Sequence, residues 1–119
     1  MSRWDRGVSY EALKRKIIQQ VMEQRRNLKG VRASRRLAYL TILAIQLRNG
    51  SRVSEALDAF RNFLNKEYET RGKKKVTHVR VRKKRAKEPR LMIYPEFIPF
   101  AVVNQLRAFK VEASVDAVR

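Results

Sequence analysis

The sequence predicts a single α+β domain that is mainly helical, with a four-helix core and a small antiparallel β-hairpin or sheet between the third and fourth helices. Apolar residues recur at spacings of three and four in four segments, which is the helical period. A stretch of alternating β-branched residues interrupts this pattern after the third segment. A length of 119 residues suffices for one modest core but not for two.

The chain is expected to begin with a short arm, residues 1–8, followed by one domain over residues 9–119. The first helix is predicted over residues 10–29. Ser9 can cap its start, and Gly30 suits a C-terminal position that needs a positive φ. Its apolar stripe consists of Tyr10, Leu13, Ile17 and Val21.

The second helix is predicted over residues 34–48, starting near Ser34 and ending before Asn49. Residues 37–47 are apolar nearly all round, which indicates a central helix surrounded by protein. This run is about half of the roughly 20 residues that a membrane span needs. We therefore expect no membrane association.

The third helix is predicted over residues 52–70, with Ser51 or Ser54 as its cap and Gly72 as its stop. Glu55 in its first turn interacts favourably with the helix dipole, so it needs no catalytic explanation. The predicted buried stripe is Val53, Leu57, Phe60 and Leu64.

A β-hairpin is predicted over residues 76–94. In its first strand Thr77, Val79 and Val81 share one face, and His78, Arg80 and Arg82 share the other. Because isolated hairpins are marginally stable, we expect the valine face to pack on the helices or the hairpin to gain a third strand. The last helix is predicted over residues 99–112, with Pro99 at its first position.

Positive charge dominates the chain and concentrates around the hairpin. Twenty-nine Lys and Arg stand against eleven acids, which gives a formal net charge of +18. Residues 71–90 hold eleven of these cations and a single acid, Glu88. Neutralised phosphates release condensed counterions, so such a field displayed on an ordered strand predicts a nucleic-acid-binding domain.

The predicted nucleic-acid-binding residues are basic side chains on and near the hairpin, one arginine at the start of the third helix and two in the first helix. They are Lys73, Lys74, Lys75, Arg80, Arg82, Lys83, Lys84, Arg85, Lys87, Arg90, Arg52, Arg25 and Arg26.

Other classes of site have little support. The chain has no cysteine and one histidine, which excludes disulfides, thiolate sites and multi-histidine metal sites. We therefore predict no metal and no cofactor. No secretory signal is visible in the first ten residues, which favours a cytoplasmic location. Residues 91–119 carry three basic and three acidic side chains, so this neutral end is a candidate surface for neighbouring proteins.

Two segments resemble the tyrosine recombinases of the integrase family. Residues 50–57, Gly-Ser-Arg-Val-Ser-Glu-Ala-Leu, look like the box that supplies the family's first catalytic arginine, which matches Arg52. Residues 79–95 resemble the hairpin with the catalytic lysine, for which Lys84 is the best match and Lys83 and Lys87 are alternatives. The resemblance implies a helical core with a small antiparallel sheet and DNA as the partner.

The resemblance does not extend to the family's second half. No histidine-x-x-arginine box follows the hairpin, and no tyrosine lies in a helix after it, since Tyr94 belongs to the predicted strand. The third helix also lacks the family's usual tryptophan-x-aspartate ending. We therefore predict no enzymatic activity for this chain alone. Arg52 and Lys84 are remnant candidates that could clamp one phosphate, or else a structural arginine and a solvated lysine.

Three functions stay open. The first is a small ribosomal or ribosome-associated protein that binds ribosomal RNA, favoured by size, charge and the missing active site. The second is a DNA-binding chromosomal, accessory or regulatory factor derived from a recombinase. The third is a split recombinase that needs a second chain for its nucleophile. RNA is preferred slightly over DNA, with the ribosome or the nucleoid as the expected location.

Overall fold

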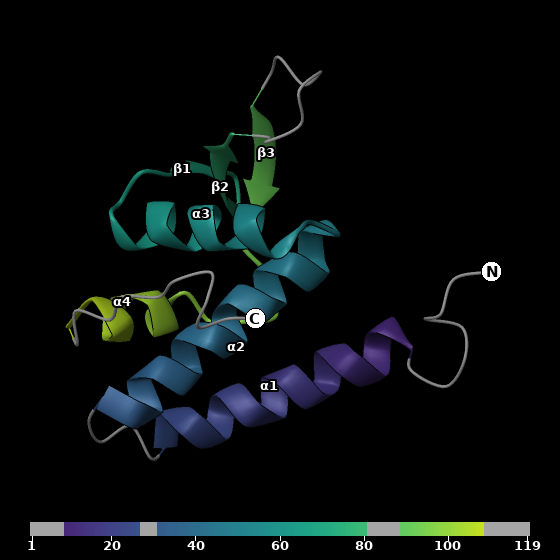
Figure 1. Cartoon of the computed structure of the whole chain (residues 1–119), viewed down its shortest axis with the longest axis vertical. Coiled ribbons are helices and arrows are strands. Elements are labelled where there is room, and N and C mark those ends of the chain that lie inside the picture. The colour runs from purple at the N-terminus through teal and green to yellow at the C-terminus, as the bar shows by residue number, and fades with distance from the viewer. Residues whose placement is uncertain (1–8, 27–30, 81–88, 109–119) are drawn as a thin grey trace.

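A computed structural model of the chain describes residues 9–26, 31–80 and 89–108 (Figure 1). Within these residues it contains four helices and a three-stranded antiparallel sheet, and the strands lie between the third and fourth helices. The predicted α+β, mainly α class is confirmed. The helices are α1 (Tyr10–Arg26), α2 (Val31–Asn49), α3 (Val53–Leu64) and α4 (Ala101–Ala108), and the strands are β1 (Glu69–Arg71), β2 (Lys74–Val79) and β3 (Arg90–Ile93).

The elements are arranged with the sheet at one end of the molecule and α1 at the other. The strands lie over α3, and α2 crosses the middle between α3 and α1 (Figure 1). The end of α1 and the start of α2 meet on the side away from the sheet. Lys73 and Lys74 at the β1–β2 turn are therefore far from Arg26 at the end of α1 and Arg32 at the start of α2.

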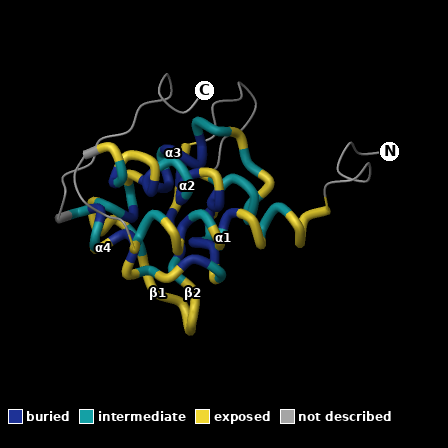
Figure 2. Tube along the Cα trace, turned by 90° about the horizontal axis from the view of Figure 1, so that it is seen from below, coloured by how far each residue is buried: buried dark blue, intermediate teal, exposed yellow. Residues whose placement is uncertain are grey.

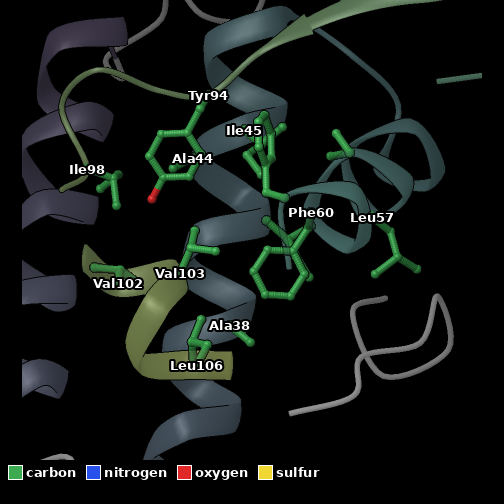
Figure 3. Packing of buried hydrophobic residues seen from close by; sticks show 14 of the residues in the cluster. Ala38, Ala44, Ile45, Leu57, Phe60, Tyr94, Ile98, Val102, Val103 and Leu106 are labelled. Atoms are coloured by element: carbon green, nitrogen blue, oxygen red, sulfur yellow. The ribbon is translucent and has the colours of Figure 1, made fainter. Parts of the chain in front are cut away.

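The core is built around α2. Leu37, Ile42 and Ile45 of this helix are fully buried, as the apolar run predicts. Phe60 of α3 and Val103 of α4 pack on the same side of α2 (Figure 3). Burial of such side chains contributes about 1.5–3 kcal/mol each. Dark blue buried residues run through the centre of the trace, whereas the turn between β1 and β2 is exposed (Figure 2).

The sheet has the order β1-β2-β3, so β2 is central. Val76 pairs with Glu69 on one side and with Ile93 on the other. The predicted hairpin thus gains a third strand, because Gly72 at φ +63° reverses the chain between β1 and β2. Thr77 and Val79 are buried as expected, and the Asn62 amide of α3 donates to the Thr77 hydroxyl, while Val81 lies outside the described residues.

The predicted third helix over residues 52–70 is wrong at its C-terminal end, since α3 ends at Leu64. Lys66 adopts a positive φ of 63°, which breaks the helix. The guanidinium of Arg107 in α4 donates to the carbonyls of Phe63 and Leu64 at 2.7 and 2.8 Å. The chain can therefore leave the helix at this point with its last carbonyls satisfied, which frees residues 69–71 for β1.

The start of α3 also differs from the prediction. Neither Ser51 nor Ser54 caps the helix; Arg52 occupies the N-cap position in an extended conformation. The carboxylate of Glu55 accepts a hydrogen bond from the backbone N–H of Arg52 at 3.1 Å. Glu55 therefore has a structural role beyond its favourable place in the helix dipole.

Further boundaries shift by a few residues. The predicted second helix, 34–48, begins earlier, at Val31, which leaves Ser34 fully buried inside it. The last helix, predicted over 99–112, begins at Ala101; the carbonyl of Pro99 accepts a hydrogen bond from Val102. The hairpin predicted over 76–94 has its strands at 74–79 and 90–93. The arm 1–8 and the predicted ends at 27–29 and 109–112 lie outside the described residues.

An ion pair between Arg48 and Glu96 joins the end of α2 to the segment after β3, with two hydrogen bonds of 2.8 and 3.0 Å. These bonds lower the pKa of Glu96 from 4.5 to about 2. A carboxylate whose pKa is lower in the folded state stabilises the fold above pH 4.5, and this contribution disappears as the pH falls toward 2.

We therefore expect Glu96→Gln to lower the free energy of unfolding at pH 7 by about 1 kcal/mol, a value reduced by solvent screening at this half-exposed pair. The loss should vanish near pH 2, as measured by urea denaturation across the pH range. Glu67→Gln, at an exposed side chain, serves as the control. Equal losses at pH 7 and pH 2 would contradict the assignment.

Candidate nucleic-acid interface

The sheet is attached to the helices at the end of α2. The side-chain amide of Asn49 donates to the carbonyl of Ile93 and accepts from the N–H of the same residue, both at 2.9 Å. Asn49 thus pairs with the free edge of β3 as a neighbouring strand would. Its backbone carbonyl accepts from the guanidinium of Arg90 at the other end of β3. This junction places β3 beside the start of α3.

A buried carboxylate organises the same junction. Glu55, only 5% exposed, accepts a hydrogen bond from Arg90 Nη1 at 3.1 Å through the Oε1 atom that also accepts from the Arg52 backbone. The Arg90 guanidinium is thereby held between α2, α3 and β3. We conclude that Arg90, a predicted nucleic-acid contact, is engaged within the protein.

The guanidinium of Arg52, in contrast, is free to contact a ligand. Its side chain is exposed and forms no ion pair with any other residue that the structure describes. The hydrogen bond from its backbone to Glu55 fixes where the side chain leaves the helix start. A guanidinium presented in this way is suited to bidentate contact with a phosphate oxygen pair.

The basic residues of the sheet fall into two groups at opposite ends of β2. Lys73 and Lys74 lie at the exposed β1–β2 turn (Figure 2), and Arg80 is exposed just after β2 ends. Six residue steps from Lys74 to Arg80 separate the two groups by ~20 Å. They therefore reach different phosphates of an extended backbone rather than one compact anion.

Two of the predicted binding residues are occupied by contacts inside the protein. The Lys75 amino group lies over the rings of Phe100 and Tyr68, 4.9 and 5.8 Å from their centroids. Arg25 of α1 donates to the Gln105 side chain of α4 at 3.0 Å. Such cation–π and hydrogen-bonding contacts stabilise the fold by about 1 kcal/mol each.

The remaining predicted residues divide between exposed and undescribed positions. Arg26 is exposed at the end of α1. The predicted tip of the hairpin falls in residues 81–88, outside the described part of the chain. This group comprises Arg82, Lys83, Lys84, Arg85 and Lys87.

A further group of exposed basic residues was missed by the sequence prediction. Arg32, Arg35 and Arg36 are all exposed in the first two turns of α2. They belong to residues 24–54, a segment without any acid. The signal that could have revealed them is this acid-free run, which the stronger charge density of residues 71–90 obscured. We call these three residues the α2 arginines.

In residues 9–26, 31–80 and 89–108, no three His, Asp or Glu side chains come together as a metal site. No helix in these ranges is long and apolar enough to cross a bilayer.

The chain matches no protein-family model, no curated protein and no solved structure. The resemblance to tyrosine recombinases therefore stays a prediction from the residues of two segments.

Arg90 pairs with Val79 across the sheet, and Arg80 follows Val79 directly. The two arginines differ in role, which allows a direct test. We expect Arg90→Gln to lower the free energy of unfolding by about 2 kcal/mol, because Glu55 is left buried without its cation. Arg80→Gln should leave stability within about 0.5 kcal/mol. Urea denaturation of both variants checks this. Equal stability of the two variants would mean that the Glu55–Arg90 pair does not hold the junction together.

Proposed function

We propose that this chain binds nucleic acid by holding its phosphate backbone. The observation that carries the proposal is the exposure of Arg52, Lys73 and Arg80, which form no ion pairs within the described residues. Lys74 is exposed as well, although its charge also helps to lower the pKa of Glu96. Cations left without partners across a folded surface repel one another, and a polyanion relieves this repulsion. The formal net charge of +18 supports the same proposal.

The proposed role is non-catalytic. Tyr94, four residues after Arg90, is 5% exposed, and its hydroxyl donates to the carbonyl of Pro99. Burial raises the pKa of Tyr94 above its ordinary value, which makes its oxygen a poor nucleophile. Arg52 then serves to bind a phosphate rather than to stabilise a reaction at it.

Ribosomal RNA is the first proposed partner, with the ribosome in the cytoplasm as the location. Small size and a high density of cations suit a protein that fills a space between RNA segments. The two ends of β2 could contact separate stretches of a folded RNA. The neutral segment 91–119 would then face neighbouring proteins.

DNA is the second candidate, and one arrangement favours it. Arg52 stands at the start of a helix that is followed by an antiparallel sheet, which is the order that the recombinase resemblance implies. The β2–β3 connection that contains Lys84 follows Arg80. In this case the chain would be an accessory or regulatory factor at the nucleoid, or one part of a split recombinase.

Salt dependence tests the backbone-binding proposal. If about five to eight phosphates are neutralised, the slope of log affinity against log salt should lie near −4 to −7. Replacing Arg52, Lys73 and Lys74 with glutamine should make the slope shallower by about 2 to 3, as measured by fluorescence anisotropy. Lys14→Gln, whose amino group lies 5.3 Å from the Phe97 ring centroid, is the single-charge control. A wild-type slope near zero would refute the proposal.

The choice between RNA and DNA requires the native partner. We expect the tagged chain, captured from its source cells at low salt, to carry ribosomal RNA and to lose it after ribonuclease treatment. Deoxyribonuclease should leave the captured nucleic acid intact, because the contacts lie on RNA. Sequencing of the bound material checks this. Recovery of chromosomal DNA that ribonuclease does not release would replace the first candidate with the second.

A further inference from the structure

A groove runs between α1 and α2 and reaches the start of α3. One cavity of about 590 Å³ is lined by Gln20 and Gln24 of α1 and by Arg36 and Tyr39 of α2. A neighbouring cavity of about 520 Å³ continues past Tyr10 toward the start of α3. Leu43 and Gln46 line both cavities, so the two form one groove. From Arg36 to Leu47 it follows ~17 Å of α2.

The floor of the groove is apolar and partly uncovered. Leu43 is 41% exposed although it projects from the central helix of the core, and Tyr10 is exposed to the same extent. Tyr39 and Leu40 pack against the core from the same side and complete the floor. Aromatic and aliphatic surface of this kind contacts flat, weakly polar ligands.

Polar groups without protein partners line the groove. Gln20, Gln24 and Gln46 are half-buried residues whose side-chain amides form no hydrogen bond within the described part of the chain and remain open to the groove. The Ser51 hydroxyl at the far end is buried and also has no partner there. Buried polar groups normally find a partner, which applies here to the Ser51 hydroxyl. Together with the three free amides it offers hydrogen bonds to a ligand with polar edges.

The mouth of the groove is strongly cationic. Arg36 lines it, Arg32 lies one helical turn before Arg36 on the same face, and Arg35 is exposed beside them. No acid occurs between Glu23 and Glu55 to neutralise them. A ligand that combines a flat body, polar edges and negative charge has the chemistry of a nucleotide.

We propose that this groove holds unpaired bases of a single-stranded nucleic-acid segment, with the α2 arginines on the adjoining phosphates. The proposal rests on the nucleic-acid binding inferred above and specifies the strand that is bound. Bases inside a duplex are stacked and paired, so only an unpaired segment can place them against Tyr39 and Leu43. Glutamine amides then hydrogen-bond to the exposed base edges.

An apolar helix from a partner protein fits the groove less well. Such a helix would cover Leu43 and Tyr39 but would leave the glutamine amides and Ser51 without partners. It would also bring no charge to the α2 arginines. A nucleotide satisfies the apolar floor, the amides and the arginines together.

The test compares two glutamate substitutions at equally exposed leucines. Leu43→Glu adds a negative charge inside the groove, and Leu91→Glu adds the same charge on the sheet, where Leu91 is 39% exposed. Binding is measured by fluorescence anisotropy with a labelled mixed-sequence RNA of about 12 nucleotides, single-stranded and as a duplex. Thermal melts followed by circular dichroism verify that both variants are folded.

We expect wild-type protein to prefer the single strand, and Leu43→Glu to bind it about tenfold more weakly than Leu91→Glu does. The two variants should bind the duplex alike. Tyr39→Leu should also weaken single-strand binding about tenfold, while Tyr39→Phe should retain it because the ring is kept. These results together would establish the groove as a base-binding site.

Other outcomes separate this inference from the proposed function. If the protein binds both nucleic acids with a steep salt slope but Leu43→Glu and Leu91→Glu bind the single strand equally, the groove inference is wrong and backbone binding stands. If Tyr39→Phe loses as much affinity as Tyr39→Leu, stacking on the ring is excluded. If wild-type protein binds neither form, both proposals fail.

Discussion

The structure depends on the junction where Asn49 and Glu55 join the sheet to the helices. Asn49 satisfies the backbone of Ile93 on the edge of β3, and Glu55 holds the guanidinium of Arg90 and the backbone of Arg52 on one oxygen. A three-stranded sheet of short strands has little stability alone, so its position comes from these contacts and from the packing of Met92. Because one carboxylate serves both arginines, the position of the sheet and the direction of the Arg52 side chain are coupled.

This coupling gives the basic residues different roles. Arg90, Arg48 and Arg107 bond to protein oxygens and stabilise the packing of elements that are distant in sequence. Arg52 is exposed at the same junction, and Arg80 is exposed at the end of β2. Positive charge in this chain therefore cannot be equated with binding surface. An exposed cation without a partner is better able to bind a phosphate than one that already donates to the protein.

The sequence predicted the fold class because periodicity is a local property that each helix carries in its own residues. The buried run of α2 and the alternation of Thr77 and His78 could be interpreted without any tertiary information. The end of α3 could not, because it depends on Arg107, which lies 43 residues after Leu64 in the chain. The role of Arg90 was likewise hidden, since nothing local distinguishes an arginine that pairs with Glu55 from one that faces solvent. The groove was missed for the same reason: Gln20 and Tyr39 become neighbours only when α1 packs on α2.

The distribution of unpaired cations restricts the kind of polyanion that this surface can bind. Lys74 and Arg80 are separated by the length of β2, and the α2 arginines lie beyond the core on the side away from the sheet (Figure 1). A single phosphate or a short acidic peptide could neutralise one of these groups but not all three. An extended backbone with regularly spaced charge can reach all of them while releasing counterions at each. If the apolar groove beside the α2 arginines receives unpaired bases, the partner must combine a continuous backbone with an exposed single-stranded segment. Folded RNA meets both conditions within one molecule, whereas duplex DNA meets only the first.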